Sequence, residues 1–193
     1  MSLPTRVETP RLTLRTWQTD DAETMALAVT ESIDHLRPWL PWIAFEPLTV
    51  KERHELIAGW ERDRGANGDT VYGIFLDGLP IGGTGLHRRV GPNGLEIGYW
   101  VHPDHTRRGF ATEVVAALTD VALAVDGIDR VEIHHDRANV ASGRVPEALG
   151  YELIEESERP VEAPSESGIT CVWVMTEDRW ALRRANPASR PER

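Results

Sequence analysis

A buried strand that leads through a short basic turn into a helix is the feature that most constrains this chain. Residues 95–101 (LEIGYWV) form an apolar run typical of a buried strand, and the segment after residue 110 has apolar residues at helical spacing. Arg107, Arg108 and Gly109 lie in the turn between them. The first turn of a helix offers unpaired backbone N–H groups and a partial positive charge, and a glycine lets a ligand approach the backbone. The sequence therefore predicts that residues 107–112 bind a phosphorylated cofactor.

The size and composition indicate one globular domain. The chain has 193 residues, of which 40% are hydrophobic and 27% are charged, and this length is enough to bury a single sizeable core. We expect the domain to span residues 1–182. Residues 183–193 contain two prolines and four arginines and are predicted to form a disordered tail.

The net charge and the hydropathy limit the partners and the location of the protein. A formal net charge of −10 argues against a nucleic-acid-binding protein, which needs a basic face to displace counterions. The sequence shows no basic-then-apolar leader, and no apolar run approaches the ~20 residues that a membrane span needs. We therefore expect a cytoplasmic protein without a membrane partner.

Neither the cysteine nor the histidines predict a metal site. Cys171 is the single cysteine, which excludes an intramolecular disulfide and a cysteine-rich zinc site. His102 and His105 lie in a proline-containing loop, and no carboxylate or cysteine is spaced to complete a site with them. His134 and His135 are adjacent on a predicted strand, so their side chains point to opposite faces. One of these two remains a candidate base in a cleft, because histidine titrates near neutral pH.

Mixed strands and helices predict an α/β (α+β) domain with one central mixed sheet. The expected strands are residues 11–15, 70–76, 80–88, 95–101, 130–135, 151–157 and 169–176. The expected helices are residues 22–29, 49–64 and 141–149, and one that starts after residue 110 and ends near Gly127. The proline-rich segment 36–42 fits a short helical turn, and its Trp39 and Trp42 either line a pocket or belong to the core.

The glycine-rich segment Gly82-Gly83-Thr84-Gly85 shares little more than composition with a nucleotide-binding loop. No helix follows it, and it lacks the Lys-Ser/Thr pair of a phosphate-binding ATPase loop. We interpret it as part of a strand beside the hairpin turn at Asp77-Gly78.

Five stretches of the chain carry a resemblance to a known family. They are residues 8–15 (ETPRLTLR), 35–42 (HLRPWLPW), 96–101 (EIGYWV), 108–113 (RGFATE) and 139–145 (NVASGRV), the last followed by 149–151 (LGY). In this order they resemble the GNAT superfamily of N-acetyltransferases. Within it, the chain is similar to the RimJ/RimL type, which acetylates the N-terminal amines of ribosomal proteins. The resemblance covers nearly the whole chain.

The resemblance implies a single GNAT-like domain that uses acetyl-CoA, with a central sheet of about seven strands splayed between its fourth and fifth strands. The backbone of Trp100 and Val101 would pair with the pantetheine arm, and an N–H there would stabilise the oxyanion. Asn139 would hydrogen-bond the cofactor, and Ser142 would donate a proton to the leaving thiolate. Backbone N–H groups would hold the pyrophosphate, and they belong to Arg107, Arg108, Gly109, Phe110, Ala111 and Thr112.

Three positions in or next to these motifs depart from the family's pattern. Thr106 stands where the phosphate motif begins with Gln or Arg, and the Arg107 beside it stands where many relatives have glycine. Pro146 stands where many relatives place a tyrosine acid, which leaves Ser142 or water as the acid. The proline is also predicted to interrupt the helix 141–149, because it lacks an N–H.

The general base stays open between Glu96 and His134. A base is needed because only the neutral amine attacks the thioester. Glu96 lies on the fourth strand of the family's fold, where a shift of one residue turns a side chain to the other face. His134 lies five residues before Asn139.

The acceptor also stays open. A protein N-terminus is the leading hypothesis and predicts an open groove near Trp39 and Trp42, which would bind the substrate. A small amine predicts a closed acidic pocket, and succinyl-CoA as the donor predicts a roomier or basic one. A non-catalytic sensor would bind acyl-CoA without turnover. The closing strands of such folds often pair, which is compatible with a homodimer.

Overall fold

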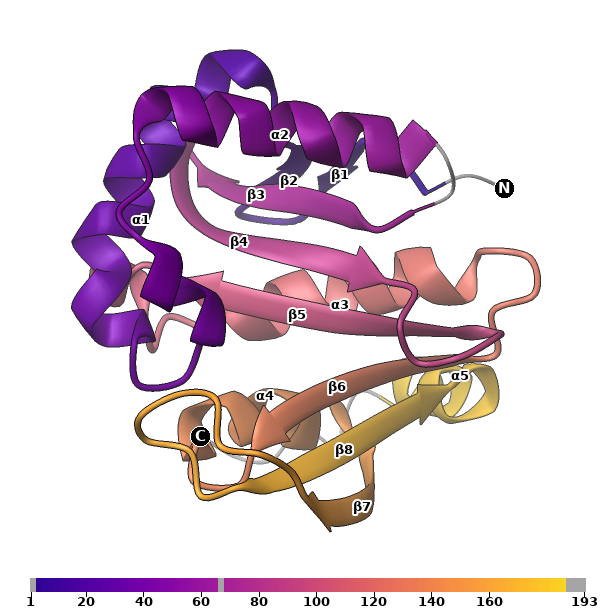
Figure 1. The fold of residues 1–193 in the computed structure, drawn as a ribbon. Helices are drawn as coiled ribbons and strands as arrows, with labels where there is room; N and C mark the ends of the chain where they lie inside the picture. Colours follow the sequence, from indigo (N-terminus) through magenta and orange to yellow (C-terminus); the bar gives the residue numbers. More distant parts are fainter. Residues whose placement is uncertain (1–2, 66–67, 187–193) are drawn as a thin grey trace.

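One mixed β-sheet forms the centre of the protein, and helices cover both of its faces (Figure 1). The structure is a computed structural model that describes residues 3–65 and 68–186. Its strands are β1 (Arg6–Glu8), β2 (Thr13–Thr16), β3 (Thr70–Leu76), β4 (Leu79–His87), β5 (Gly94–Val101), β6 (Arg130–Asp136), β7 (Glu152–Glu158) and β8 (Ile169–Thr176). The sheet order is β1-β2-β3-β4-β5-β6-β8-β7, and neighbours are antiparallel except the parallel pair β5 and β6. The predicted single α/β domain with a mixed sheet is confirmed.

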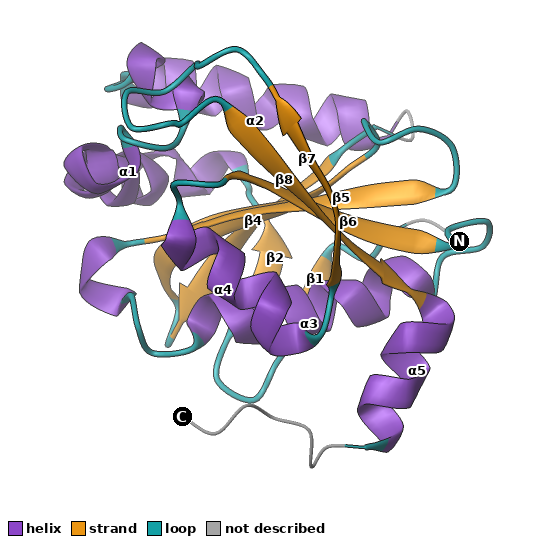
Figure 2. Cartoon of the chain, turned by 90° about the horizontal axis from the view of Figure 1, so that it is seen from below, coloured by secondary structure: helices purple, strands orange, loops and turns teal. Residues whose placement is uncertain are grey.

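The helices form two layers, one on each face of the sheet (Figure 2). Helices α1 (Ala22–Leu36) and α2 (Val50–Gly65) cover one face, and α3 (Phe110–Leu123) and α4 (Val140–Leu149) cover the other. Helix α5 (Glu177–Ala185) follows β8 directly. Short 3₁₀ turns occupy Thr19–Asp21, Pro41–Phe45 and Pro103–His105.

Three elements differ from the sequence-based expectations. The short edge strand β1 pairs with β2 and raises the number of strands from about seven to eight. Helix α1 continues to Leu36 instead of ending at residue 29. Helix α5 was not predicted, and it makes residues 183–185 helical where a disordered tail was expected. Asn186 caps this helix, and the remaining residues of that predicted tail, 187–193, lie outside the described residues.

The core has two parts, one under each helical layer. The larger part packs α3 and α4 against the sheet, and α3 contributes Val114, Val115 and Leu118, which are fully buried. The smaller part lies under α1 and α2 and contains Trp17 and Phe75. Since α3 was recognised from the spacing of its apolar residues, its buried face confirms that prediction.

The glycine-rich segment lies inside β4, as predicted, and the structure gives the reason for its composition. The indole of Trp100 on β5 lies against this strand, and a Cβ on Gly83 would come within 2.5 Å of its Nε1. Any larger residue would therefore displace Trp100.

Strands β5 and β6 separate along their length, which positions the site. They pair only through Gly94–Arg130, Leu95–Val131 and Glu96–Glu132. Beyond these pairs, β5 continues beside β4 while β6 continues beside β8 (Figure 1). The sheet is thus splayed between these two strands, as the resemblance implied for the family's fourth and fifth strands.

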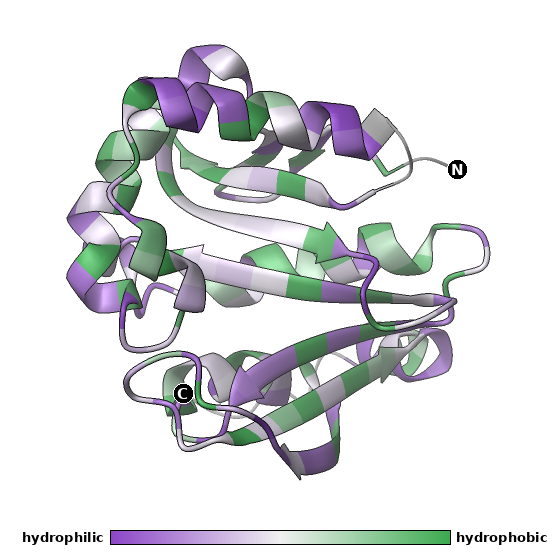
Figure 3. Cartoon of the chain, viewed as in Figure 1, coloured by the Kyte–Doolittle hydropathy of each residue, from purple (hydrophilic) through white to green (hydrophobic). Residues whose placement is uncertain are grey.

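The outer surface is polar at the sheet edge. Strand β7 is hydrophilic along most of its length (Figure 3), and its glutamates discourage pairing with another strand. None of the helices in residues 3–65 and 68–186 is long and apolar enough to span a membrane.

Candidate active site

A cleft of about 1140 Å³ opens where β5 and β6 separate. Its walls come from β5, the turn before α3, the end of β6 and the start of α4. Most of the predicted site residues line it, namely Trp39, Glu96, Trp100, Val101, Arg107, Gly109, Phe110, Ala111, Thr112, His134, Asn139 and Ser142. The fold therefore brings together residues that are more than a hundred positions apart in the sequence.

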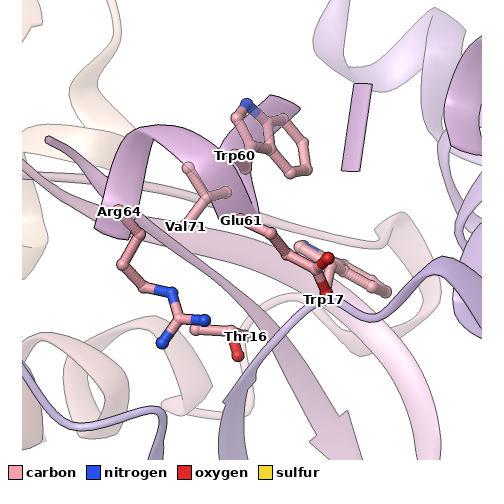
Figure 4. A pocket seen from close by; sticks show the side chains of 6 residues that line it. All are labelled: Thr16, Trp17, Trp60, Glu61, Arg64 and Val71. Carbon is pink, nitrogen blue, oxygen red and sulfur yellow. The ribbon is translucent and has the colours of Figure 1, made fainter. Parts of the chain in front are cut away.

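A second, much smaller cavity lies between α2 and the strands β2 and β3. It measures about 10 Å³ and is lined by Trp17, Trp60, Glu61, Arg64 and two smaller residues (Figure 4). Such a volume holds at most one water molecule. The large cleft is therefore the candidate site.

The turn before α3 has the backbone that anion binding requires. Gly109 is the N-cap residue and has a φ of 77°, and Arg107 has a φ of 56°. Both angles lie in the left-handed region, where glycine is favoured, so Arg107 holds a conformation that is strained for a residue with a side chain. An arginine here adds a positive charge beside the free N–H groups of the first turn of α3.

Two neighbours of this turn have other contacts. The guanidinium of Arg108 lies over the ring of Phe110, 4.8 Å from its centroid, and Arg108 is not a lining residue of the cleft. The Oγ1 of Thr106 donates to the carbonyl of Pro103 at 2.9 Å, so this side chain closes the preceding turn. The predicted role of Arg108 is thus limited to its backbone.

A salt bridge between Arg11 and Glu113, which the sequence did not predict, stabilises the same turn. Arg11 donates from Nε to Glu113 Oε2 at 2.6 Å and from Nη1 to the carbonyl of Arg108 at 2.9 Å. Glu113 lies in the first turn of α3. The N-terminal segment therefore holds the helix start from outside the cleft.

Alternation along β5 and β6 divides the cleft residues between the two faces of the sheet. Ile97 and Tyr99 pack into the core under α3, whereas Trp100 packs toward the core under α1 and α2. On β6, Ile133 points to the α3 side, so His134 points to the other face. The predicted opposite orientation of His134 and His135 is confirmed, because His135 lies against Gly143 of α4.

Both candidate bases belong to one charged network on the α1 side of the sheet. Arg89 donates to the two oxygens of Glu96 at 2.7 and 2.6 Å, and His134 Nδ1 lies 3.9 Å from Glu96 Oε2. On its other side, His134 Nε2 lies 2.7 Å from Glu132 Oε2, and Arg130 Nε donates to Glu132 at 2.8 Å. Each carboxylate thus stands between an arginine and the histidine.

The environment of Glu96 makes it a weak base. Burial by itself would raise the pKa of this carboxyl, but the hydrogen bonds and the charge of Arg89, aided by His134 and His87, lower it below its usual range. A carboxylate with a low pKa keeps its charge and has little affinity for a proton. Arg89 and Glu132 were not predicted, because their place is set by the loop between β4 and β5 and by the register that puts Glu132 opposite Glu96.

The predicted acid lies on the opposite face. Ser142 is in the first turn of α4, where its backbone N–H donates to Asn139 Oδ1 at 3.2 Å. The hydroxyl of Tyr99 donates to the Ser142 carbonyl at 2.9 Å and lies 3.2 Å from Ser142 Oγ. Burial raises the pKa of Tyr99 to about 12, so this phenol stays neutral.

Pro146 does not interrupt α4, and that prediction was wrong. The helix runs through it from Val140 to Leu149. A proline at this position removes the N–H that would bond the carbonyl of Ser142, four residues earlier. The Tyr99 hydroxyl bonds this carbonyl instead, which lets the helix continue.

Both ring nitrogens of His135 are bonded to neighbours. Trp173 Nε1 donates to Nε2 at 2.9 Å, and Nδ1 lies 2.8 Å from the carbonyl of Asp136, which can only accept. This arrangement fits a neutral imidazole with its proton on Nδ1. His134 is therefore the histidine whose Nδ1 faces the charged network of the cleft.

The two predicted tryptophans differ in position. Trp39 lines the cleft together with Leu36, Leu40 and Pro41. Trp42 is not a lining residue, and its ring lies 6.4 Å from that of Trp100, which it supports. Within the described residues, no three His, Cys, Asp or Glu side chains are grouped as metal ligands.

The sequence matches a known family and one curated relative. The model of the acetyltransferase (GNAT) domain family matches residues 11–152. The uncharacterized N-acetyltransferase YjdG of Bacillus subtilis (strain 168) is 31% identical over 78 residues, which make up 40% of this chain and 46% of that protein. The chain thus matches about half the length of this relative.

Solved structures share the fold. RimJ from Mycobacterium smegmatis, in complex with CoA-disulfide, has a TM-score of 0.82 at 22% identity, with 98% of each chain covered. RimL, a ribosomal L7/L12 alpha-N-protein acetyltransferase in complex with coenzyme A, has a TM-score of 0.80 at 17% identity, covering 93% of this chain and 99% of that chain. The family model includes β5, the turn before α3 and all of α4. The chain therefore belongs to the GNAT acetyltransferase family.

Proposed function

We propose that this protein transfers the acetyl group of acetyl-CoA to the N-terminal amine of a protein. The observation that carries the proposal is the separation of β5 and β6, which opens the cleft. The N-terminus of α3, which suits a phosphate, lies at this cleft. The candidate bases lie on one face of the sheet and the candidate acid lies on the other. The complexes of RimJ with CoA-disulfide and of RimL with coenzyme A support the donor. The description of RimL as an alpha-N-protein acetyltransferase supports the acceptor.

The donor's place follows from the free edge of β5. From Ile97 to Val101 this strand pairs with β4 alone, so its other edge is available to an extended pantetheine arm, as it would be to a strand. The pyrophosphate would lie at the N–H groups of residues 107–112, next to the charge of Arg107. A backbone N–H of β5 would stabilise the oxyanion.

His134 is the general base in this proposal. Glu132 accepts the hydrogen of His134 Nε2, which leaves the lone pair of Nδ1 directed to the cleft. The Glu96 carboxylate attracts the acceptor ammonium, and Nδ1 removes one of its protons. The neutral amine then attacks the thioester carbon and forms the C–N bond.

The leaving group departs toward the other face. As the tetrahedral intermediate collapses, the C–S bond breaks with its electron pair on sulfur, and Ser142 Oγ donates a hydrogen bond to the thiolate. The attacking nitrogen loses its second proton to solvent, which leaves the neutral amide. Base and leaving group therefore act on separate sides of the sheet. The proton taken by His134 returns to solvent after product release.

The shape of the cleft favours a peptide over a small amine. Its acceptor side is bounded by Trp39 and by the loop between β7 and β8, where Arg159, Pro160 and Glu162 are exposed. An exposed wall of this kind leaves room for an acceptor that extends out of the cleft, as a chain terminus would. A closed acidic pocket would have favoured a small amine.

The test uses acetyl-CoA and a panel of short peptides that differ in their first residue. Free CoA and the peptide mass are measured, with N-terminally blocked peptides and spermidine as matched acceptors. We expect turnover and a gain of one acetyl group on the free N-termini alone. Turnover on spermidine alone would overturn the peptide acceptor, and faster turnover with succinyl-CoA would overturn the acetyl donor. Stabilisation by acetyl-CoA without turnover on any amine would indicate a sensor.

A further inference from the structure

We propose that Tyr99 is a positioning residue that aligns the hydroxyl of Ser142 toward the leaving thiolate. This inference rests on the proposed function and extends it to a residue to which the resemblance assigned no role. Tyr99 lies on β5 and Ser142 on α4, so the contact joins the two elements that face each other across the splay.

The proline of α4 creates the need for this contact. In an α-helix the carbonyl of Ser142 would accept from the N–H of residue 146, which in this chain is a proline. The Tyr99 hydroxyl donates to that carbonyl at 2.9 Å. The phenol thus replaces one backbone donor of the helix.

The direction of the hydrogen bonds follows from the chemistry of the three oxygens. A carbonyl can only accept, so the one hydrogen of the Tyr99 hydroxyl points to the Ser142 carbonyl. The distance of 3.2 Å between Tyr99 Oη and Ser142 Oγ then has the serine as donor. One phenol therefore holds both the backbone and the side chain of Ser142.

The same geometry serves the reaction. When sulfur gains the electron pair of the C–S bond, Ser142 turns its hydrogen to the thiolate. The Tyr99 hydroxyl, which already lies within reach of both oxygens of Ser142, shares its hydrogen with Oγ. A hydroxyl that accepts a hydrogen bond is a stronger donor, so Tyr99 strengthens the bond from Ser142 to sulfur.

Tyr99 keeps its own proton throughout. Burial raises the pKa of Tyr99 to about 12, whereas a free thiol has a pKa of about 8.5. The thiolate does not take a proton from the phenol. The role of Tyr99 is therefore to orient and polarise Ser142, and not to act as the acid that many relatives place seven residues after the asparagine.

The experiment separates the structural role of the phenol from the catalytic one. Tyr99→Phe removes the hydroxyl and keeps the ring, and Pro146→Ala restores the N–H that reaches the Ser142 carbonyl but not Oγ. Rates are measured with acetyl-CoA and a short peptide with a free N-terminus, beside thermal unfolding. We expect Tyr99→Phe to lower kcat about tenfold, the value of one hydrogen bond, with the KM for acetyl-CoA nearly unchanged. In the double variant, stability returns and kcat stays low.

A second background tests whether the two side chains act together. Ser142→Ala lowers kcat, and adding Tyr99→Phe is expected to lower it no further. Recovery of wild-type kcat in Tyr99→Phe/Pro146→Ala, or independent losses in the Ser142→Ala background, would overturn the inference. If Tyr99→Phe alone does not fold, the variant that also carries Pro146→Ala answers the same question.

Failure of this inference differs from failure of the proposed function. An inactive wild-type enzyme on every amine would remove both. An active wild-type enzyme with an equally active Tyr99→Phe variant would remove the inference alone.

Discussion

The two faces of the splay hold their functional groups by different kinds of interaction. On the α1 side, Glu96, His134 and Glu132 form a row of charged and titratable groups closed by arginines at both ends. On the α4 side, Tyr99 and Ser142 are neutral and joined by hydrogen bonds alone. The difference matches the tasks that we propose. A group that attracts an ammonium and removes its proton needs charge, whereas a donor to a thiolate needs only alignment.

The largest effect is expected from removing the base on the charged face. His134→Gln should lower kcat by on the order of a hundredfold, because general base catalysis is lost. The rate of CoA release with a free N-terminal peptide measures this. The matched control is His54→Gln on the exposed surface of α2, which should keep wild-type kcat. An unchanged rate in His134→Gln would show that the charged groups on the α1 side do not supply the general base.

A smaller loss is expected when the partner of the base changes. In Glu132→Gln, Arg130 retains the carbonyl oxygen of the new amide, and the amide NH₂ then faces His134 Nε2. This donor would force the proton of the histidine onto Nδ1 and block the lone pair that faces the cleft. We expect kcat to fall about tenfold with folding intact. A rise in acceptor KM at constant kcat would contradict a role through His134.

The charged face should also show in the pH dependence of stability. The folded-state pKa of Glu96 is lowered from its ordinary value of 4.5, so this group stabilises the fold above that pH. The contribution is lost as pH falls through 4.5 toward the folded-state value. Glu96→Gln should therefore cost about 1 kcal/mol at neutral pH and progressively less below pH 4.5, measured by denaturant unfolding.

The control for this series is Glu147→Gln, which lies on the exposed surface of α4. Its stability should follow the wild type at every pH. A constant difference between Glu96→Gln and the wild type across acid pH would show that the Arg89 pair does not hold the charge of Glu96.

The smallest effect on stability is expected at the turn before α3, where we propose that the pyrophosphate of the donor binds. Arg107→Gly should raise the free energy of unfolding by about 0.5 kcal/mol, because about 1 kcal/mol of left-handed strain is relieved and about 0.5 kcal/mol of glycine entropy is lost. The KM for acetyl-CoA should rise as the charge is removed. Arg107→Lys keeps both strain and charge, and should match the wild type in stability and nearly in KM.

Local patterns were sufficient for much of the fold, and they supplied the residues at which we propose that the donor binds. Apolar spacing predicted β5 and α3, and the basic glycine turn between them predicts a phosphate site. Alternation on β6 placed His134 and His135 on opposite faces. These features depend on residues within a few positions of each other, so a sequence shows them directly.

Long-range pairing decided the rest. The parallel register sets Glu96 opposite Glu132, and with it the charged row around His134. The phenol that satisfies α4 at Pro146 comes from a residue 43 positions before Ser142 in the chain. From the local sequence alone, Pro146 predicts a broken helix, but a hydrogen-bond donor from β5 lets the helix continue. The sequence by itself determined which groups are present and on which face of a strand each side chain lies. Only the tertiary structure decided their partners, because hydrogen bonds and ion pairs form between neighbours in space.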